Sequence, residues 1–255
     1  ECYCQSGALS QYATISKKIL RTRYEALFTD TDPGPTVIPA VKKSGLSSDL
    51  VAEGISRRPI LFIGDVGVGK STFIRYLINV EATKVFENAL TFYIDLGSQA
   101  TLSDDLRNFI LMEIQEQLRK EYDVDIEKSN FVRGVYHFEL QRFENGIYGD
   151  LKKENPQSYA LKELEFLEEK VKFIDRHMRD SLDHISRGRK KQIVIFIDNA
   201  DQRNDETQQT AFIIAQELAE NWPATIFVAL RPETFHRSLR TGALSGYHPK
   251  AFSIS

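Results

Sequence analysis

The chain has 255 residues, of which 42% are hydrophobic and 27% are charged, which is an ordinary balance for a globular protein. Its 33 basic and 36 acidic residues give a formal net charge of -3, so no global positive field indicates binding to nucleic acid or an anionic membrane. No apolar run approaches the roughly 20 residues that a membrane span needs, and we therefore expect no membrane partner.

Cys2 and Cys4 are the two cysteines, and a single residue separates them. A disulfide between them would be strained, and two thiols cannot complete a zinc site without histidines at suitable spacing. We therefore expect free thiols in a reducing cytosol and a cytoplasmic location. The chain begins with Glu1 and lacks a basic-then-apolar signal pattern, so we expect a piece of a longer protein.

Residues 1–45 are predicted to form a helical and linker segment ahead of the main domain. Apolar side chains recur near one face from about Ser10 to Phe28, which predicts a helix. A stretch rich in Asp, Pro and Gly then breaks the chain. Residues 46–255 are assigned to one domain.

The stretch from Gly64 to Thr72 carries the strongest motif, G-x-x-x-x-G-K-[ST], between an apolar run and a helical pattern. Its glycines allow the backbone to curl so that successive N–H groups point at a phosphate chain, and the following helix adds its free N–H groups. A glycine loop that merely joins two elements is the alternative, which this context disfavours. The predicted phosphate-binding residues are Gly64, Asp65, Val66, Gly67, Val68, Gly69, Lys70, Ser71 and Thr72.

Three residues of this motif have predicted individual roles. Lys70 would reach the β- and γ-phosphates of a nucleotide, Ser71 would bind Mg²⁺, and Thr72 would contact a nearer phosphate. The helix that they open is predicted to run to about Val80.

A second strand is predicted at Leu90–Leu96, and a helix to about Tyr122 follows it. Strand, loop, helix, strand and helix in this order are typical of a parallel sheet that is covered on both faces. The predicted fold class is therefore α/β, with a three-layer parallel-sheet core.

A mainly helical insertion is predicted at about 123–190. Its first part mixes aromatic and charged residues and is interpreted as helices or a hairpin. From Tyr159 to Ile185, apolar residues step by threes and fours, which predicts one long amphipathic helix. This helix would either cover the insertion or form a coiled-coil seam, and the first is the commoner arrangement. The basic cluster Arg187–Lys191 would either contact nucleic-acid phosphates or form a solvated turn, and the turn is favoured.

Residues 193–201 supply the second half of the predicted site. Five apolar residues predict a strand that is buried on both faces, and Asp198 stands at its carboxyl end, where open α/β sheets bind ligands. Asp198 would hold Mg²⁺ opposite Ser71, usually through a water molecule. An acid that merely ends a core strand is the alternative, and the presence of the glycine loop disfavours it.

The residue after Asp198 is Asn199, which cannot take a proton from an attacking water, although it can orient one. Asp201 is the nearest carboxylate in the sequence and is the predicted general base, with a cap or turn role as an equal alternative. Arg231 ends a strand predicted at 224–230, where a cation would sense the γ-phosphate. Pairing of Arg231 with an acid is its structural alternative.

Between these strands, Asp205 with Gln208 predicts the start of a helix over 206–221. Arg237 and Arg240 lie on a later helical stretch and would act as arginine fingers or form an exposed face, the second being favoured. A last strand is predicted at 251–255.

The three motif-bearing stretches together resemble a known family. Their spacing is similar to that of the additional-strand P-loop NTPases, in which an extra strand, here 225–230, lies between the Walker A and Walker B strands. The I-D-N-A-D pattern from Ile197 and the strand ending in Arg-Pro resemble the STAND and KAP NTPases, which are relatives of the AAA+ proteins. Those families often have D-D-x-D where this chain has Asp198, Asn199 and Asp201. The resemblance covers roughly residues 40–255.

This resemblance implies an ATP-binding, Mg²⁺-dependent switch module with slow or regulated hydrolysis, whose partners are other copies of the chain or other domains of a longer chain. It also implies a regulatory role such as bacterial defence or signalling. Because no helical pattern follows the last predicted strand, we expect this piece of the chain to lack the helical lid that such proteins normally have. We expect ATP rather than GTP because no N-K-x-D motif follows the loop. The alternatives are a nucleic-acid-acting motor, motivated by the basic cluster, and an ATP-binding scaffold with little hydrolysis, motivated by Asn199.

Overall fold

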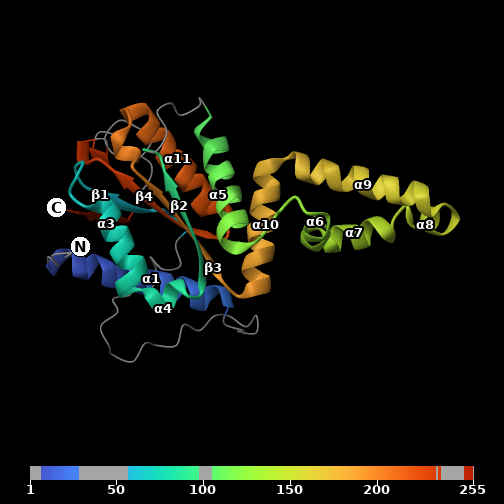
Figure 1. The fold of residues 1–255 in the computed structure, drawn as a ribbon, viewed down its shortest axis with the longest axis horizontal. Coiled ribbons are helices and arrows are strands. Elements are labelled where there is room, and N and C mark those ends of the chain that lie inside the picture. Colours follow the sequence, from blue (N-terminus) through green and yellow to red (C-terminus); the bar gives the residue numbers. More distant parts are fainter. Residues whose placement is uncertain (1–6, 29–56, 98–104, 234, 237–249, 255) are drawn as a thin grey trace. The chain divides into compact units, whose positions relative to one another are not determined.

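The computed structural model describes residues 7–28, 57–97, 105–233, 235–236 and 250–254 (Figure 1). The chain divides into two compact units. Residues 1–106 and 190–255 form the sheet unit, and residues 107–189 form the helical unit. The boundary predicted between residues 45 and 46 lies outside the described residues, and the predicted domain limits stay a prediction.

A five-stranded sheet is the centre of the sheet unit, and all of its strand pairs are parallel. The strands in spatial order are β2 (Ala89–Asp95), β3 (Gln192–Asp198), β4 (Ala224–Leu230), β1 (Ile60–Ile63) and β5 (Lys250–Ser253). Strand β4 therefore lies between the strand that precedes the glycine loop and the strand that ends in Asp198. This order confirms the predicted α/β class and the extra strand.

One face of the sheet carries a row of aromatic side chains. Phe196 stacks on Phe227 at 4.8 Å between ring centroids, and Phe227 stacks on Phe62 at 5.3 Å. Buried side chains of the N-terminal helix, among them Ile19 and Leu20, pack into the same core. The elements that contribute to this core beside the strands are α1 (Gly7–Phe28), α3 (Lys70–Tyr76), η1 (Leu77–Glu81) and α4 (Thr83–Phe86).

Helix α11 (Asp205–Asn221) packs on β4 from the other side of the sheet (Figure 1). Its N-cap is Asn204, whose side-chain oxygen accepts a 2.8 Å hydrogen bond from Thr207 N. The prediction that Asp205 and Gln208 cap this helix was wrong, because Asp205 is already helical and Gln208 is fully buried. The Gln208 amide instead donates to Arg203 O at 3.0 Å and accepts from Arg231 N at 3.3 Å, which ties α11 to two loops.

The helical unit contains helices throughout its described residues, and no hairpin occurs in its first part, 123–158. The elements are α5 (Leu106–Tyr122), α6 (Ser129–Val135), α7 (His137–Glu144), α8 (Gly149–Glu154), α9 (Pro156–Lys172) and α10 (Ile174–Arg189). The single long helix predicted over 159–185 was wrong. It is two helices, because Phe173 between them has a non-helical backbone, with φ -88 and ψ 79. Apolar steps of three and four continue across this break, so periodicity could not locate it.

A buried polar link stabilises the helical unit. His177 Nε2 lies 2.9 Å from Ile126 O and its Nδ1 lies 3.0 Å from the Tyr136 hydroxyl. A carbonyl oxygen can only accept, so Nε2 carries the proton and Nδ1 accepts from Tyr136. Burial raises the pKa of Tyr136 to about 12. None of the helices in the described ranges combines the length and the apolar character that a membrane crossing requires.

Candidate functional site

The glycine loop owes its shape to backbone conformations and close approaches that side chains would disturb. Gly67 and Gly69 have φ values of +85° and +97°, in the left-handed region that favours glycine. A Cβ on Gly64 would lie 2.5 Å from Ile254 O, at the point where the chain leaves β1 beside the end of β5. Gly69 is also the N-cap of α3, so the loop leads directly into a helix N-terminus.

Lys70 is the first residue of α3 and is only 5% exposed. Its ammonium group donates hydrogen bonds of 2.7 Å to Gly64 O and to Asp65 O. The positive charge is therefore held against the start of the loop, beside the helix N-terminus. Both features attract an anion such as a phosphate group.

Asp198 ends β3 and is fully buried. Its Oδ1 accepts a 2.8 Å hydrogen bond from Asn199 N, and its Oδ2 accepts one from the hydroxyl of Tyr93. Burial and this bond to Asp198 raise the pKa of Tyr93, while a hydrogen bond with Ser71 acts in the opposite direction. The structure thus brings Ser71 and Asp198, the two predicted Mg²⁺ ligands, to the same hydroxyl group.

The donor set at this point suits Mg²⁺, which prefers a carboxylate, hydroxyl or phosphate oxygen to nitrogen or sulfur and keeps several waters. Within the part of the chain that the structure describes, no group of three or more His, Cys, Asp or Glu side chains could hold a metal ion. An all-protein cage is therefore absent there. A Mg²⁺ ion here would take one hydroxyl and one carboxylate from the described residues, and its other ligands would be water or oxygen atoms of a bound molecule.

Asp95 and Tyr93 are two site residues that the sequence reasoning missed. Strands β2 and β3 pair in register, so Asp95 lies beside Asp198. Asp95 Oδ1 accepts hydrogen bonds from Asn199 Nδ2 at 2.6 Å and from Gly97 N at 2.8 Å. Strand alternation places residues 93 and 95 on one face. From the sequence, this alternation and the end of the predicted strand at Leu96 could have marked Tyr93 and Asp95 as candidates. The pairing of β2 with β3, which places them beside Asp198, could not be predicted.

Asp201 lies in the short 3-10 helix η2 (Ala200–Gln202), and its side chain is outside what the structure describes. Arg231 directly follows β4, so it stands between the strands that carry the loop and Asp198. Its Nε is buried and has no hydrogen-bond partner among the described residues. An anion at this position would supply the missing acceptor. Arg237 and Arg240 lie outside the described residues.

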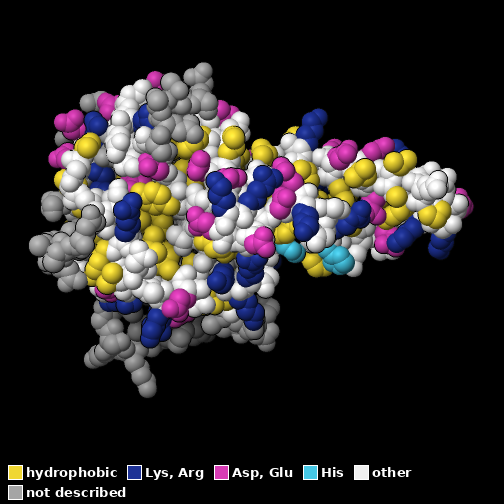
Figure 2. Space-filling model, in the orientation of Figure 1, with side chains coloured by type: hydrophobic (Ala, Val, Ile, Leu, Met, Phe, Trp, Pro, Cys, Tyr) yellow, Lys and Arg dark blue, Asp and Glu magenta, His cyan; other side chains and the backbone are white. Residues whose placement is uncertain are grey.

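The basic cluster ends α10, where Arg187 and Arg189 are exposed in the last turn. Arg187 pairs with Asp183 at 2.9 Å, and Arg179 of the same helix pairs with Asp180 at 2.8 Å. On the face shown in Figure 2, basic and acidic side chains of the helical unit are interspersed. This face offers no continuous basic surface for a nucleic-acid backbone.

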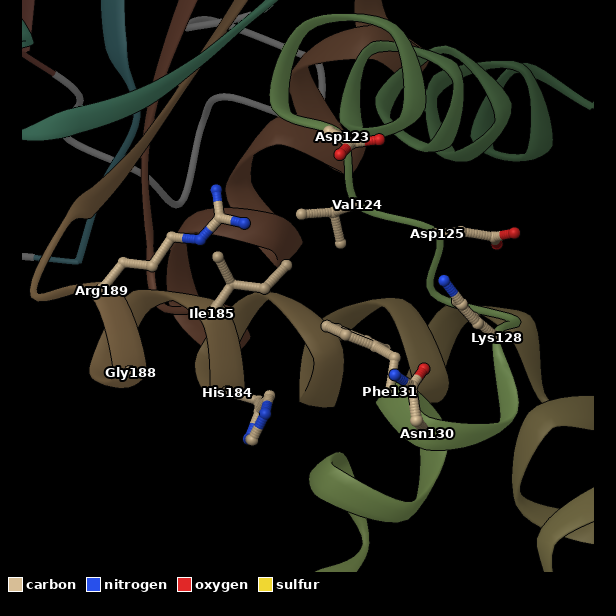
Figure 3. A pocket seen from close by; sticks show the side chains of 10 residues that line it. All are labelled: Asp123, Val124, Asp125, Lys128, Asn130, Phe131, His184, Ile185, Gly188 and Arg189. Carbon is tan, nitrogen blue, oxygen red and sulfur yellow. The ribbon is translucent and has the colours of Figure 1, made fainter.

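A cavity of about 410 Å³ lies within the helical unit, between the loop after α5 and helix α10 (Figure 3). Side chains of both signs line it, with Asp123 and Asp125 on the loop and Arg189 on the helix. Every predicted nucleotide-binding residue belongs instead to the sheet unit. We assign this cavity no part in nucleotide binding.

Comparison with known protein families identifies a domain in this chain. A family model described as an AAA domain matches residues 55–220, which is more than half of the chain. The matched stretch includes the glycine loop, Tyr93, Asp95 and Asp198. No match was found among curated proteins or among solved structures.

Proposed function

Because the chain belongs to the AAA domain family, we propose that it is a Mg²⁺-dependent ATPase that serves as the switch module of a STAND- or AAA+-like regulatory protein. One observation carries this proposal. Asp198 is the last residue of β3, Arg231 directly follows β4, and Lys70 lies at the end of the loop that follows β1; these three strands are neighbours in the sheet. Ligands of open parallel sheets bind at this edge.

The proposed roles follow from the contacts of each group. Backbone N–H groups of residues 64–72 and the ammonium of Lys70 would bind the β- and γ-phosphates. Ser71 and Asp198 would hold Mg²⁺, which when bound neutralises phosphate charge. Arg231 would contact the γ-phosphate, and its buried Nε, which has no hydrogen-bond partner among the described residues, supports this role. Asp65, Val66 and Val68 would bind phosphate through their backbone N–H groups.

Two carboxylates are candidates for the general base, because Asn199 cannot accept a proton. Asp201 is the candidate that the sequence order suggests. Asp95 is the carboxylate that the described residues place next to Asp198, and its hydrogen bond from Asn199 fixes its orientation. We propose that Asp95 takes this role, and a comparison of the two variants decides between them.

The regulatory part of the proposal rests on the resemblance to the STAND and AAA+ families. Binding or slow hydrolysis of ATP would change the conformation of the chain, with self-association or other domains of a longer chain as the partners. Defence or signalling in the cytoplasm is the proposed setting. No guanine-reading motif supports GTP, so ATP is the proposed nucleotide.

Substitution of Lys70→Ala tests the nucleotide site directly. We expect nucleotide affinity or turnover to fall by about tenfold or more, because the phosphate-binding cation is lost. Isothermal titration with ATP and a phosphate-release assay measure the two quantities. Lys84→Ala, which removes an exposed lysine of α4, is the matched control and should change neither. Equal behaviour of both variants and the unsubstituted chain would refute the proposal.

An ATP-binding scaffold with little hydrolysis is the second candidate function. Asn199 favours it, because the residue directly after Asp198 is not a carboxylate and the Asn199 amide is engaged by Asp95 and Gln202. Tight ATP binding without phosphate release, at every protein concentration tested, would support the scaffold over the ATPase. Turnover that DNA or RNA stimulates, and that salt weakens steeply, would indicate a nucleic-acid motor instead.

A further inference from the structure

The hydroxyl group of Tyr93 contacts both predicted metal ligands. Tyr93 is the register partner of Phe196 across β2 and β3, so its side chain emerges on the same face as Asp198, two residues further along. Its hydroxyl donates to Asp198 Oδ2 and is also hydrogen-bonded with Ser71. A metal ion held by Asp198, directly or through a bound water, would compete with the Tyr93 hydroxyl for the Asp198 carboxylate.

The hydrogen bond from Tyr93 also stabilises Asp198 when no metal is bound. Asp198 is fully buried, and a buried carboxylate is costly unless donors compensate its charge. Asn199 N supplies one donor to Oδ1 and Tyr93 supplies one to Oδ2. Hydrogen bonds to a charged acceptor are stronger than those between neutral groups, so breaking this one opposes metal binding.

We propose that Tyr93 is a positioning residue that competes with Mg²⁺ for Asp198 and Ser71. The metal then binds only when the hydrogen bond from the Tyr93 hydroxyl to Asp198 is broken. The inference rests on the proposed function, because it requires Ser71 and Asp198 to be the metal ligands. Its consequence is a metal affinity that is lower than the ligands alone would give. Nucleotide binding without metal should not depend on the Tyr93 hydroxyl.

Tyr93→Phe tests this competition, since it removes the hydroxyl and keeps the ring. Mn²⁺, which electron paramagnetic resonance detects, replaces Mg²⁺ in a titration of the full chain at saturating ADP. We expect Mn²⁺ to bind about three- to tenfold more tightly to the variant, because a charge-assisted hydrogen bond no longer has to be broken. ADP affinity in the presence of EDTA should be unchanged.

The matched control is Tyr24→Phe, which removes a hydroxyl that donates to Lys190 O at 3.2 Å in the same unit. It should leave Mn²⁺ affinity unchanged. Unchanged or weaker Mn²⁺ binding in Tyr93→Phe overturns the inference, because the hydroxyl would then be neutral or would help the metal. If the unsubstituted chain fails to bind ADP, the proposed function fails and the inference fails with it.

A second measurement does not depend on the folding of the variant. Displacement of the Tyr93 hydroxyl changes the surroundings of a buried phenol, so Mg²⁺ added to the ADP complex of the unsubstituted chain should change its near-ultraviolet tyrosine spectrum. In the control titration, NaCl of equal ionic strength is added to the ADP complex in place of the Mg²⁺ salt. If the metal binds without this spectral change, the proposed competition between Tyr93 and Mg²⁺ is wrong.

Discussion

The side-chain amide of Asn199 donates a 2.6 Å hydrogen bond to Oδ1 of Asp95, across the paired ends of β2 and β3. The amide oxygen of Asn199 accepts a second bond, 2.9 Å long, from Gln202 Nε2. Asn199 has a left-handed backbone, with φ 57, and its N–H donates to Asp198. This residue therefore links two carboxylates to the turn that follows β3, and both halves of its amide are engaged.

Substitution of Asp95→Asn should lower ATP turnover by about 100-fold, because a general base typically contributes a factor of this order. ATP affinity should stay within about twofold, since Lys70 and the loop are untouched. Phosphate release at saturating ATP and isothermal titration give the two values.

Glu87→Gln is the control for the loss of one negative charge, because Glu87 is exposed and precedes the other end of β2. Turnover that survives Asp95→Asn but is lost in Asp201→Asn would assign the base to Asp201. Loss of ATP affinity in Asp95→Asn would show that Asp95 has a structural role instead.

Asn199→Asp should destabilise the chain by about 1–3 kcal/mol, because it puts a second carboxylate within hydrogen-bond distance of Asp95 and removes the donor between them. Adding Asp95→Asn to this variant makes residue 95 the donor and residue 199 the acceptor, and it should recover most of the lost stability. Urea unfolding of the four chains in this double-mutant cycle measures the coupling. Additive effects of the two substitutions would be inconsistent with the observed hydrogen bond.

Gly64→Ala should lower the free energy of unfolding by about 1–3 kcal/mol, because its new Cβ would meet Ile254 O at 2.5 Å and Val68 Cγ2 at 2.8 Å. The backbone there must move to relieve the contact. Gly188→Ala is the control, since among the described residues nothing except its chain neighbours and the backbone of its own helix, α10, lies within 4 Å of the added Cβ. Thermal unfolding should show Gly188→Ala to be neutral or more stable by about 0.5 kcal/mol. Equal melting temperatures for the two variants would contradict this prediction.

Tyr136→Phe should cost about 1–3 kcal/mol at pH 8, because the buried His177 Nδ1 loses its donor. A pH dependence accompanies this loss. The pKa of Tyr136 is about 12 in the folded chain and about 10 in the unfolded chain, so the stability that Tyr136 contributes is fully present below pH 10. It decreases by about 2–3 kcal/mol as the pH rises from about 10 to about 12, since only the unfolded chain releases the proton there.

Urea unfolding of both chains at pH 8, 10 and 11 checks this pH dependence. The difference between the unsubstituted chain and Tyr136→Phe should decrease above pH 10, and other titrating groups cancel in that difference. A difference that stays constant with pH would mean that Tyr136 has an ordinary pKa in the folded state.

The sequence by itself determined the glycine loop, the apolar strand that ends in Asp198, and the α/β class. These features depend on backbone preferences of glycine and on runs of apolar side chains, which act over a few residues. The first residue of α11 could not be predicted, because two adjacent residues were equally suitable N-caps. Asn204 and Asp205 are both good caps, and the burial of Gln208 beneath Arg231 is a tertiary feature.

Only the tertiary structure decided which side chains surround Asp198. Tyr93 lies 105 residues away in the chain, and it reaches Asp198 because β2 pairs with β3 in one particular register. A shift of one residue would turn Tyr93 and Asp95 to the other face of the sheet. Register depends on the packing of distant segments, whereas the loop depends on its own torsion angles. For this reason the phosphate-binding half of the site could be predicted from its motif, and the residues beside the metal-binding carboxylate could not.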